Sequence, residues 1–300
     1  MITYLLLAIT IGAGVLSIFL LRKACRKPLR DGMLTALMSF SLCLFIYLYG
    51  TWVFLSIYAK YVFGGLYLLL ALYFLWTRKP VARATNPLYK ILLIVFFGTC
   101  CVLYFTGTTG VPEKVELDFP LKKGRYFVIQ GGKGLPTNLF HFSLRGAIYA
   151  MDIVKLNDFG NRANTVFSRN LEDYAIFGDT IYSPCSGTVV RAHSSNPDNI
   201  PPNMDRGPKN TNMVVIETDT YTVFMGHMKQ NSVMVKEGDV ITVGQPLGRV
   251  GNSGFSSEPH LHIQVHKKEN GKAWYRSTPL YILFNGKGYL LNEVIKKKDL

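Results

Sequence analysis

The chain has 300 residues, 49% of them hydrophobic, and a formal net charge of +14 at neutral pH. The positive charge is uneven, because residues 1–112 contain ten basic residues against one acid, whereas residues 113–300 contain 23 against 18. Nucleic-acid binding needs a clustered basic face, but the basic residues of the first third stand in two short stretches between apolar runs. We therefore expect no nucleic-acid partner and attribute most of the excess charge to membrane topology.

Four almost uncharged apolar runs occupy residues 3–21, 33–57, 61–76 and 89–107. A helix needs about 20 apolar residues to cross a bilayer, and several such runs cannot all be buried in one small soluble core. We therefore predict four spans. The third run is short and Lys60 separates it from the second, so a tight re-entrant hairpin over residues 33–76 is the alternative. The first run is not a cleaved signal peptide, since no basic region precedes it and more spans follow.

The two basic stretches predict how the spans are oriented. Residues 22–31 contain five basic residues and one acid, and residues 77–90 contain four basic residues and no acid. Short loops rich in Lys and Arg stay in the cytoplasm. We therefore expect a multi-pass protein of the cell membrane, in contact with the lipid bilayer, whose C-terminal domain is extracellular.

The remainder of the chain is typical of a mainly-β domain. After the Gly- and Pro-containing connector come short β-type runs at residues 127–129, 188–190, 213–216 and 222–225, bounded by turn-forming residues. Residues 194–212 form a long polar stretch, which in a compact domain is often a wall of a binding site. Only Cys185 lies in this part of the chain, so it can form no internal disulfide.

Two similar segments begin with Gly178-Asp179 and Gly238-Asp239. Each continues with a β-branched pair, a turn and a second strand-like run. This pattern occurs in biotinyl and lipoyl carrier domains. A carrier would need its modified lysine at a hairpin tip beside methionine. The pair Met228-Lys229 follows a histidine instead, which argues against a carrier.

The segment from Ser253 to Val265 contains the strongest functional signal. It predicts a loop that leads into a strand, in which His260, His262 and Gln264 share one face because side chains alternate. Positions two apart in a strand are separated by roughly 6.5 Å. One imidazole can therefore bind a metal while the other reaches the group that the metal activates.

Several motifs together resemble the lysostaphin-type (LytM-like) zinc metalloendopeptidases, which cut peptide links in the bacterial cell wall. They are Gly131-Gly132, Asn138 to His141, Tyr149 to Ile153, Ser183 to Val189, Gly226-His227-Met228, Gly251 to Gly254 and Pro259 to His262. The resemblance covers residues 126–285 and implies the duplicated hybrid motif, a fold of sandwiched β-sheets. We therefore divide the chain into a transmembrane helical region (1–110), a linker (111–125), a peptidase domain (126–285) and a C-terminal tail (286–300).

The resemblance also implies the residues of a zinc site. Asp152, in an apolar predicted strand over residues 148–154, and His262 take the positions of two metal ligands. The family's common motif has its third ligand four residues before the Asp, where this chain has Ile148. A related arrangement has a histidine eleven residues before the Asp, which here is His141.

His227 and His260 take the positions of the family's catalytic histidines. They would orient a water molecule, move its proton and stabilise the oxyanion. We assign no role to His193, and His266 lies roughly 13 Å along the strand, too far to bind the same zinc as His262.

The sequence thus predicts a membrane-anchored zinc metalloendopeptidase whose substrate is the peptide of bacterial peptidoglycan. The alternative is a catalytically inactive module that binds wall peptide or regulates another hydrolase, because Ile148 replaces the usual ligand. A transporter or sensor with a β ectodomain is disfavoured, since the predicted spans lack the acids and arginines that mark a transport path.

Overall fold

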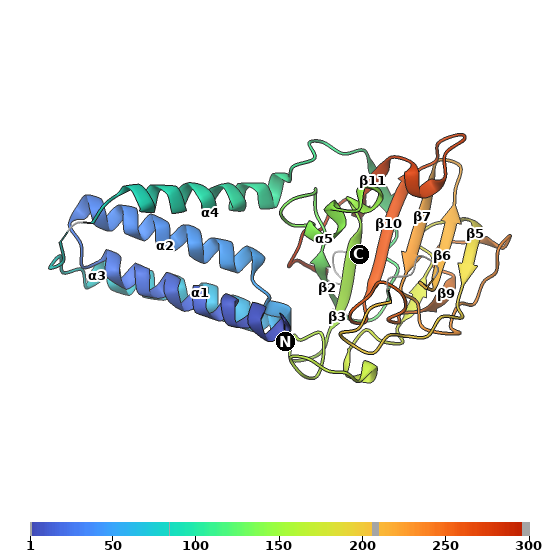
Figure 1. Cartoon of the computed structure of the whole chain (residues 1–300), viewed down its shortest axis with the longest axis horizontal. Coiled ribbons are helices and arrows are strands. Elements are labelled where there is room, and N and C mark those ends of the chain that lie inside the picture. The colour runs from blue at the N-terminus through green and yellow to red at the C-terminus, as the bar shows by residue number, and fades with distance from the viewer. Residues whose placement is uncertain (1, 84, 206–209, 296–300) are drawn as a thin grey trace. The chain divides into compact units, whose positions relative to one another are not determined.

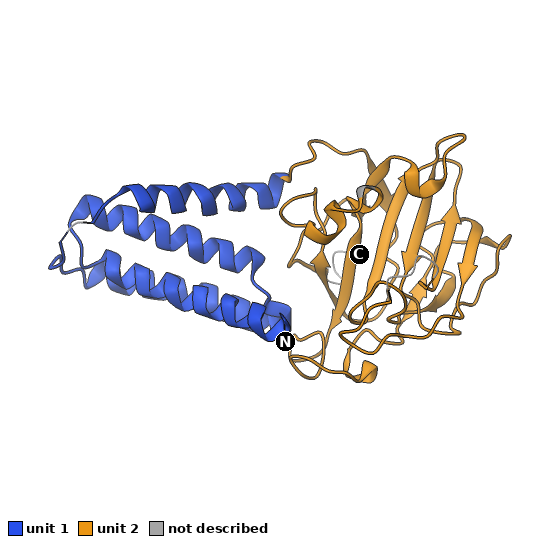
Figure 2. Cartoon of the chain, viewed as in Figure 1, with its two compact units in different colours: residues 1–106 blue, residues 107–300 orange. Residues whose placement is uncertain are grey.

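The computed structural model describes residues 2–83, 85–205 and 210–295. The chain forms two compact units, Met1–Thr106 and Gly107–Leu300 (Figure 2). The first is helical and the second is mainly β. Each unit is described by itself below.

The first unit contains four long helices: α1 (Ile2–Ala24), α2 (Leu29–Tyr49), α3 (Ile57–Trp76) and α4 (Leu88–Thr106). Each is long and apolar enough to cross a membrane, which confirms the prediction of four candidate spans. The second apolar run was expected to continue to residue 57, but α2 ends at Tyr49. Trp52, in the short helix η1 (Trp52–Phe54), donates its indole N–H to the carbonyl of Ile46 at 2.9 Å, so the chain turns here before α3 begins.

A buried charge cluster lies at the start of α2. The helix begins four residues before the predicted run and so includes Asp31, which forms ion pairs with Lys27, at 3.0 Å, and with Lys90 of α4. All three side chains are buried. Pairing offsets the large cost of removing these charges from water.

The second unit is built on one large sheet with strand order β12-β2-β3-β10-β7-β6-β5-β8 (Figure 1). Strand β11 pairs with β10 and with β1, and β4 and β9 form a separate two-stranded sheet. The strands are β1 (Lys114–Leu117), β2 (Arg125–Gln130), β3 (Met151–Leu156), β4 (Thr180–Tyr182), β5 (Gly187–His193), β6 (Met213–Glu217), β7 (Tyr221–Gly226), β8 (Val240–Ile241), β9 (Pro246–Arg249), β10 (Leu261–Lys267), β11 (Pro279–Phe284) and β12 (Val294–Ile295). The four strand segments predicted from sequence all lie within these strands, and the mainly-β architecture is confirmed.

Short helical segments connect some of these strands: α5 (Leu139–Phe142), η2 (Arg145–Ala147), η3 (Leu171–Asp173) and η4 (Trp274–Arg276). Two segments contain more regular structure than the sequence suggested. Strand β1 lies in the stretch predicted as a linker and pairs in parallel with β11. Strand β12 lies in the predicted C-terminal tail and pairs with β2.

The predicted strand over residues 148–154 is wrong at its start. Strand β3 begins only at Met151, and the three residues before it form the turn that follows η2. The side-chain amide of Asn138 donates hydrogen bonds to the carbonyls of Ile148 and Ala150, each at 3.0 Å. These carbonyls are therefore bonded to a side chain instead of to a neighbouring strand.

Strand β10 connects the core to the functional face. Leu261, Ile263 and Val265 are at most 1% exposed and belong to the hydrophobic core of the β unit. Because side chains alternate along a strand, His262 and Gln264 point to the opposite face. In the pairing register, His262 lies opposite Asp152 of β3 on one side and Gly226 of β7 on the other. The sheet thus fixes the position of the predicted site.

Candidate metal centre

The carboxylate of Asp152 lies at the centre of the predicted site. Its Oδ1 is 2.9 Å from Nδ1 of His262 and 3.4 Å from Nε2 of His260, and its Oδ2 is 3.3 Å from Nε2 of His141. Potential ligand atoms form two groups, His141-Asp152-His262 and His227-His260-His262, each with all its atoms within 4.8 Å of one another. The structure therefore brings all five predicted site residues together, and all five are buried.

His141 reaches the centre from the short helix α5. Its Nδ1 is 2.9 Å from Oδ1 of Asn138, whose amide nitrogen donates to two backbone carbonyls. Since carbonyls only accept, the Asn138 oxygen must face the ring, and Nδ1 of His141 must carry the proton. The Nε2 lone pair of the neutral ring is then directed at Asp152.

His260 and His227 are oriented by backbone carbonyls. Nδ1 of His260 is 2.8 Å from the carbonyl oxygen of Glu258, and Nδ1 of His227 is 2.8 Å from that of Ser253. Both Nδ1 atoms must therefore donate, which leaves the Nε2 lone pairs of the neutral rings free. The two rings lie side by side, with 4.7 Å between their centroids.

His262 is oriented by a chain of hydrogen bonds that begins at the carbonyl of Ser277. This oxygen accepts from Nδ1 of His266 at 3.1 Å, so Nε2 of the neutral His266 must accept, and it does so from the Gln264 amide at 3.2 Å. The Gln264 oxygen then faces His262 and accepts from its Nε2 at 3.0 Å. Consequently the Nδ1 lone pair of His262 faces Asp152.

These tautomers create a centre that requires a positive charge. In their neutral forms, His141, His260 and His262 would each direct a lone pair at a buried carboxylate 2.9–3.4 Å away, and such an arrangement is repulsive unless a proton or a cation lies between the atoms. Imidazole nitrogen together with carboxylate oxygen is a common donor set for zinc. The residues therefore fit a zinc ion.

The pKa shifts of Asp152, His227 and His260 indicate an ionised carboxylate, a neutral His227 and a protonated His260. Burial alone would raise the pKa of Asp152, but the adjacent His141 and His260 outweigh burial and hold that pKa well below its usual value. Burial, together with His260 and His262, lowers the pKa of His227 well below its usual value. Burial also acts to lower the pKa of His260, but contact with Asp152 outweighs it and raises that pKa. Without a cation, a proton on His260 can therefore occupy the place that a metal would take.

A buried ion pair supports the loop that carries His260. Arg162, only 1% exposed, donates from Nε and one Nη to the two oxygens of Glu258 at 2.8 and 2.7 Å. Two parallel bonds between a guanidinium and a carboxylate fix both distance and angle. Because the Glu258 carbonyl accepts from His260, Arg162 indirectly fixes the orientation of that imidazole.

The long polar segment predicted as a wall of the site packs against the loop before β10. Asp198 accepts from the backbone N–H of Asn252 at 2.6 Å, and Asn199 donates to the carbonyl of Gly254 at 2.6 Å. Asn212 donates its backbone N–H to the hydroxyl of Ser253 at 3.0 Å, and its side-chain oxygen accepts from the backbone N–H of Asn196 at 2.9 Å. Residues 206–209 of this segment lie outside the described residues.

Two other histidines lie outside the ligand groups, as expected from sequence. His193 contacts the hydroxyl of Ser195 at 3.3 Å. His266 is fully buried, and it orients Gln264, a role that the sequence analysis missed. The alternation of side chains along β10 could have revealed this connection, because it puts His262, Gln264 and His266 on one face. The accepting carbonyl of Ser277, eleven residues further on, gives no signal in the sequence.

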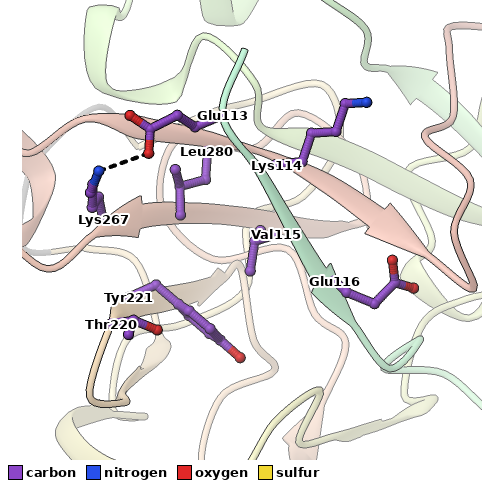
Figure 3. Close-up of a pocket in the computed structure, with 8 residues that line it drawn as sticks. All are labelled: Glu113, Lys114, Val115, Glu116, Thr220, Tyr221, Lys267 and Leu280. Atoms are coloured by element: carbon purple, nitrogen blue, oxygen red, sulfur yellow. Dashed lines mark hydrogen bonds and ion pairs between the residues drawn. The ribbon is translucent and has the colours of Figure 1, made fainter.

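A hollow of about 340 Å³ elsewhere on the β unit contains none of these residues (Figure 3). It is lined by residues 113–116, Thr220, Tyr221, Lys267 and Leu280, and Glu113 and Lys267 form an ion pair at 2.8 Å in it. The candidate site is therefore defined by its cluster of buried polar side chains and not by this hollow.

Comparison with known proteins gives a consistent result. The profile of Peptidase family M23 matches residues 171–274, a range that contains His227, His260 and His262 but neither His141 nor Asp152. An "Uncharacterized metalloprotease" of Buchnera aphidicola subsp. Baizongia pistaciae (strain Bp) is 30% identical over 159 residues, which cover 50% of this chain and 37% of the relative. The chain thus spans well under half the length of that relative.

Similar solved structures include a zinc-containing peptidase from Vibrio cholerae, with 18% identity, 56% of this chain and 40% of that chain covered, and a TM-score of 0.34. The antimicrobial peptidase lysostaphin from Staphylococcus simulans shows 20% identity over 51% of this chain and 47% of that chain, with a TM-score of 0.32. Both TM-scores are too low to support a conclusion by themselves. Residues 171–274 of the β unit are thus similar to Peptidase family M23, and four long apolar helices precede this unit.

Proposed function

We propose that this protein is a membrane-anchored zinc metalloendopeptidase that hydrolyses peptide bonds of bacterial cell-wall peptidoglycan. The observation that carries the proposal is the orientation of the buried imidazoles around Asp152. Ring nitrogens of three of them lie within 3.4 Å of its carboxylate oxygens, and His227 lies beside them. Such buried, desolvated and converging groups are typical of a catalytic metal site.

We assign His141, Asp152 and His262 as the zinc ligands. Three protein ligands with one open position are the usual arrangement in zinc hydrolases. The position of His141, 3.3 Å from Asp152, supports an intact site despite the isoleucine at position 148. It therefore favours the enzyme over the inactive binding module.

The second group of potential ligands gives an alternative assignment. His227, His260 and His262 could bind the ion, with His141 and Asp152 outside the ligand set. The two assignments share His262 and differ in every other ligand. Replacing His141 with Ala removes zinc under the first assignment and retains it under the second, whereas replacing His227 with Ala has the opposite effects.

Under the first assignment, His227 and His260 are free to act on the substrate. Bound zinc would supply a Lewis acid that polarises the scissile carbonyl and acidifies a water molecule. His227, whose pKa burial lowers, is neutral near pH 7 and can accept a proton at Nε2. His260 lies within 3.4 Å of Asp152 and can hold a proton at Nε2 for transfer to the leaving amine.

The substrate proposal rests on the resemblance in the motifs and on the predicted orientation, with the β unit outside the cell. The test uses the purified full-length chain in detergent with isolated peptidoglycan, and mass spectrometry to detect new peptide termini. We expect cleavage that a chelator abolishes and added zinc restores. A chain that binds zinc and wall peptide but creates no new termini would support the inactive binding module instead.

A further inference from the structure

Apolar side chains project into solvent from the segment that carries His141. Leu139, Phe140 and Leu144 are 59%, 71% and 51% exposed, whereas His141 between them is only 6% exposed and points toward Asp152. We call Leu139, Phe140, Phe142 and Leu144 the apolar tip. A cluster of large exposed apolar groups is unusual on a domain that also has an extensive buried core, and it marks an interaction surface.

The base of the apolar tip is bonded to the chain that leaves the last candidate span. The backbone N–H of Thr108 and the hydroxyl of Thr109 both donate to the carbonyl of Lys133 at 3.0 Å. In return, the backbone N–H of Leu135 donates to the hydroxyl of Thr108 at 3.0 Å. Residues 108–109 and 133–135 are therefore one hydrogen-bonded unit.

Gly134 shows how closely this unit packs against the apolar tip. A Cβ atom added at Gly134 would lie 2.7 Å from Cγ2 of Thr109 and 3.4 Å from Cδ2 of Phe142. Gly134 also has a φ of +84°, which favours glycine. Gly134 thus packs between Thr109 and Phe142 with no room for a side chain of its own.

Covalent continuity connects this arrangement to the bilayer. Helix α4, a candidate span, ends at Thr106, and Gly107 is the next residue. At whatever angle the β unit is held, residues 108–109 lie two or three positions beyond the end of the span, where the headgroup layer begins. The apolar tip is attached to these residues through hydrogen bonds and close packing, and Val111, which is 95% exposed, lies only five residues beyond Thr106.

We propose that the apolar tip docks into the interfacial layer of the bilayer that α4 crosses. Amphipathic segments bind there by burying apolar side chains at the boundary between headgroups and acyl chains. The short helix α5 suits this role, because His141 faces the metal centre while its neighbours face outward. Lipid contact would then hold the segment that supplies a proposed zinc ligand, and the centre would act on peptide presented at the membrane surface.

Site-specific photo-crosslinking in the full-length chain tests this proposal. Benzoylphenylalanine is introduced at position 140 or, independently, at position 144, and each variant is reconstituted in nanodiscs of phosphatidylglycerol and phosphatidylcholine. The matched control is position 240, because Val240 is 81% exposed and lies on β8. In the sheet order, β8 is at the end farthest from β2, the strand that precedes the apolar tip in the chain. Leu92, 60% exposed on α4, is the positive control for lipid contact.

We expect a phospholipid adduct by mass spectrometry at positions 92, 140 and 144, with at least ~10-fold lower yield at position 240. Equal yields at 140, 144 and 240 would overturn the proposal. Crosslinks from 140 and 144 to a second copy of the chain, or to added wall peptide in place of lipid, would also overturn it and would identify the true occupant. The readout needs neither zinc nor turnover, so its failure would leave the proposed peptidase activity untouched.

Discussion

The metal centre has two sides that differ in how their residues are arranged along the chain. On one side, His260 and His262 stand two positions apart at the start of β10, and His227 follows the end of β7, which is paired with β10. On the other side, Asp152 lies on β3 and His141 lies eleven residues earlier on a separate helix. The first side lies within the match to Peptidase family M23, and the second lies outside it. A compact motif fixes the positions of His260 and His262 through strand geometry alone, whereas a ligand on a distant turn needs supporting side chains such as Asn138.

The largest effect is expected at Asp152, whose carboxylate contacts His141 on its own side of the centre and His260 and His262 on the other. Asp152→Asn removes the negative charge that the surrounding imidazoles face, and the neutral amide is a poor zinc ligand. We expect loss of bound zinc and of all detectable hydrolysis, measured by metal analysis and by peptide release from peptidoglycan. Asp158→Asn, at an exposed acid on the loop after β3, is the control and should change neither. Stoichiometric zinc in Asp152→Asn would remove this carboxylate from the ligand set.

We call the side formed by His227, His260 and His262 the motif side. Substitutions there should separate catalysis from metal binding. His227→Ala and His260→Ala are each expected to retain zinc and to lower turnover at least ~100-fold, the usual scale for losing a general acid–base group. Zinc content and kcat on a wall peptide measure the two effects separately. Unchanged turnover in both variants would exclude these residues from the mechanism, and loss of zinc in both would favour the three-histidine ligand set.

The orientation of His262 can be tested through Gln264, which does not face the metal directly. Gln264→Leu removes the acceptor for Nε2 of His262, so the ring can adopt the wrong tautomer. Loss of such a supporting partner typically weakens metal binding by about 10–100-fold. Gln264→Glu retains an acceptor and should lose less. Zinc affinities from chelator competition would measure both, and equal losses would mean that Gln264 only fills space.

The ion pair behind the His260 loop should affect stability more than chemistry. Arg162→Met leaves the carboxylate of Glu258, whose side chain is 16% exposed, without its guanidinium partner. Removing one partner of a buried pair costs roughly 3–5 kcal/mol, and the partial exposure here argues for the lower end of that range. Denaturant unfolding of the full chain would measure it. Arg162→Met combined with Glu258→Leu should recover part of the loss, and no recovery would indicate that the cost comes from packing alone.

The sequence predicted the motif side well because strand alternation directly links spacing to position. The period of two was enough to put His262 and Gln264 on one face of β10, opposite the core residues Leu261, Ile263 and Val265, and His260 directly precedes this strand. The other side was predicted less well. Strand β3 begins at Met151 instead of residue 148, because the amide of Asn138 binds the carbonyls of Ile148 and Ala150. Such contacts between distant side chains and backbone leave no periodic signal, and for the same reason the carbonyl of Ser277 and the role of His266 were missed.

In the helical unit too, the sequence did not reveal contacts between residues that are far apart in the chain. Hydropathy identified four runs, but it did not show that α2 begins early enough to include Asp31, because the charge is acceptable only where Lys27 and Lys90 surround it. Composition indicates which segments are apolar. It does not indicate which distant charges will be paired.

The central claim is that His141 completes the zinc site in place of the residue at position 148. Zinc stoichiometry of the purified full-length chain tests it most directly, with His141→Ala compared with His193→Ala, a histidine of the same domain outside both ligand groups. We predict about one zinc per chain in the unmodified protein and in His193→Ala, and a large loss in His141→Ala. Full zinc occupancy and undiminished peptide hydrolysis in His141→Ala would contradict the account.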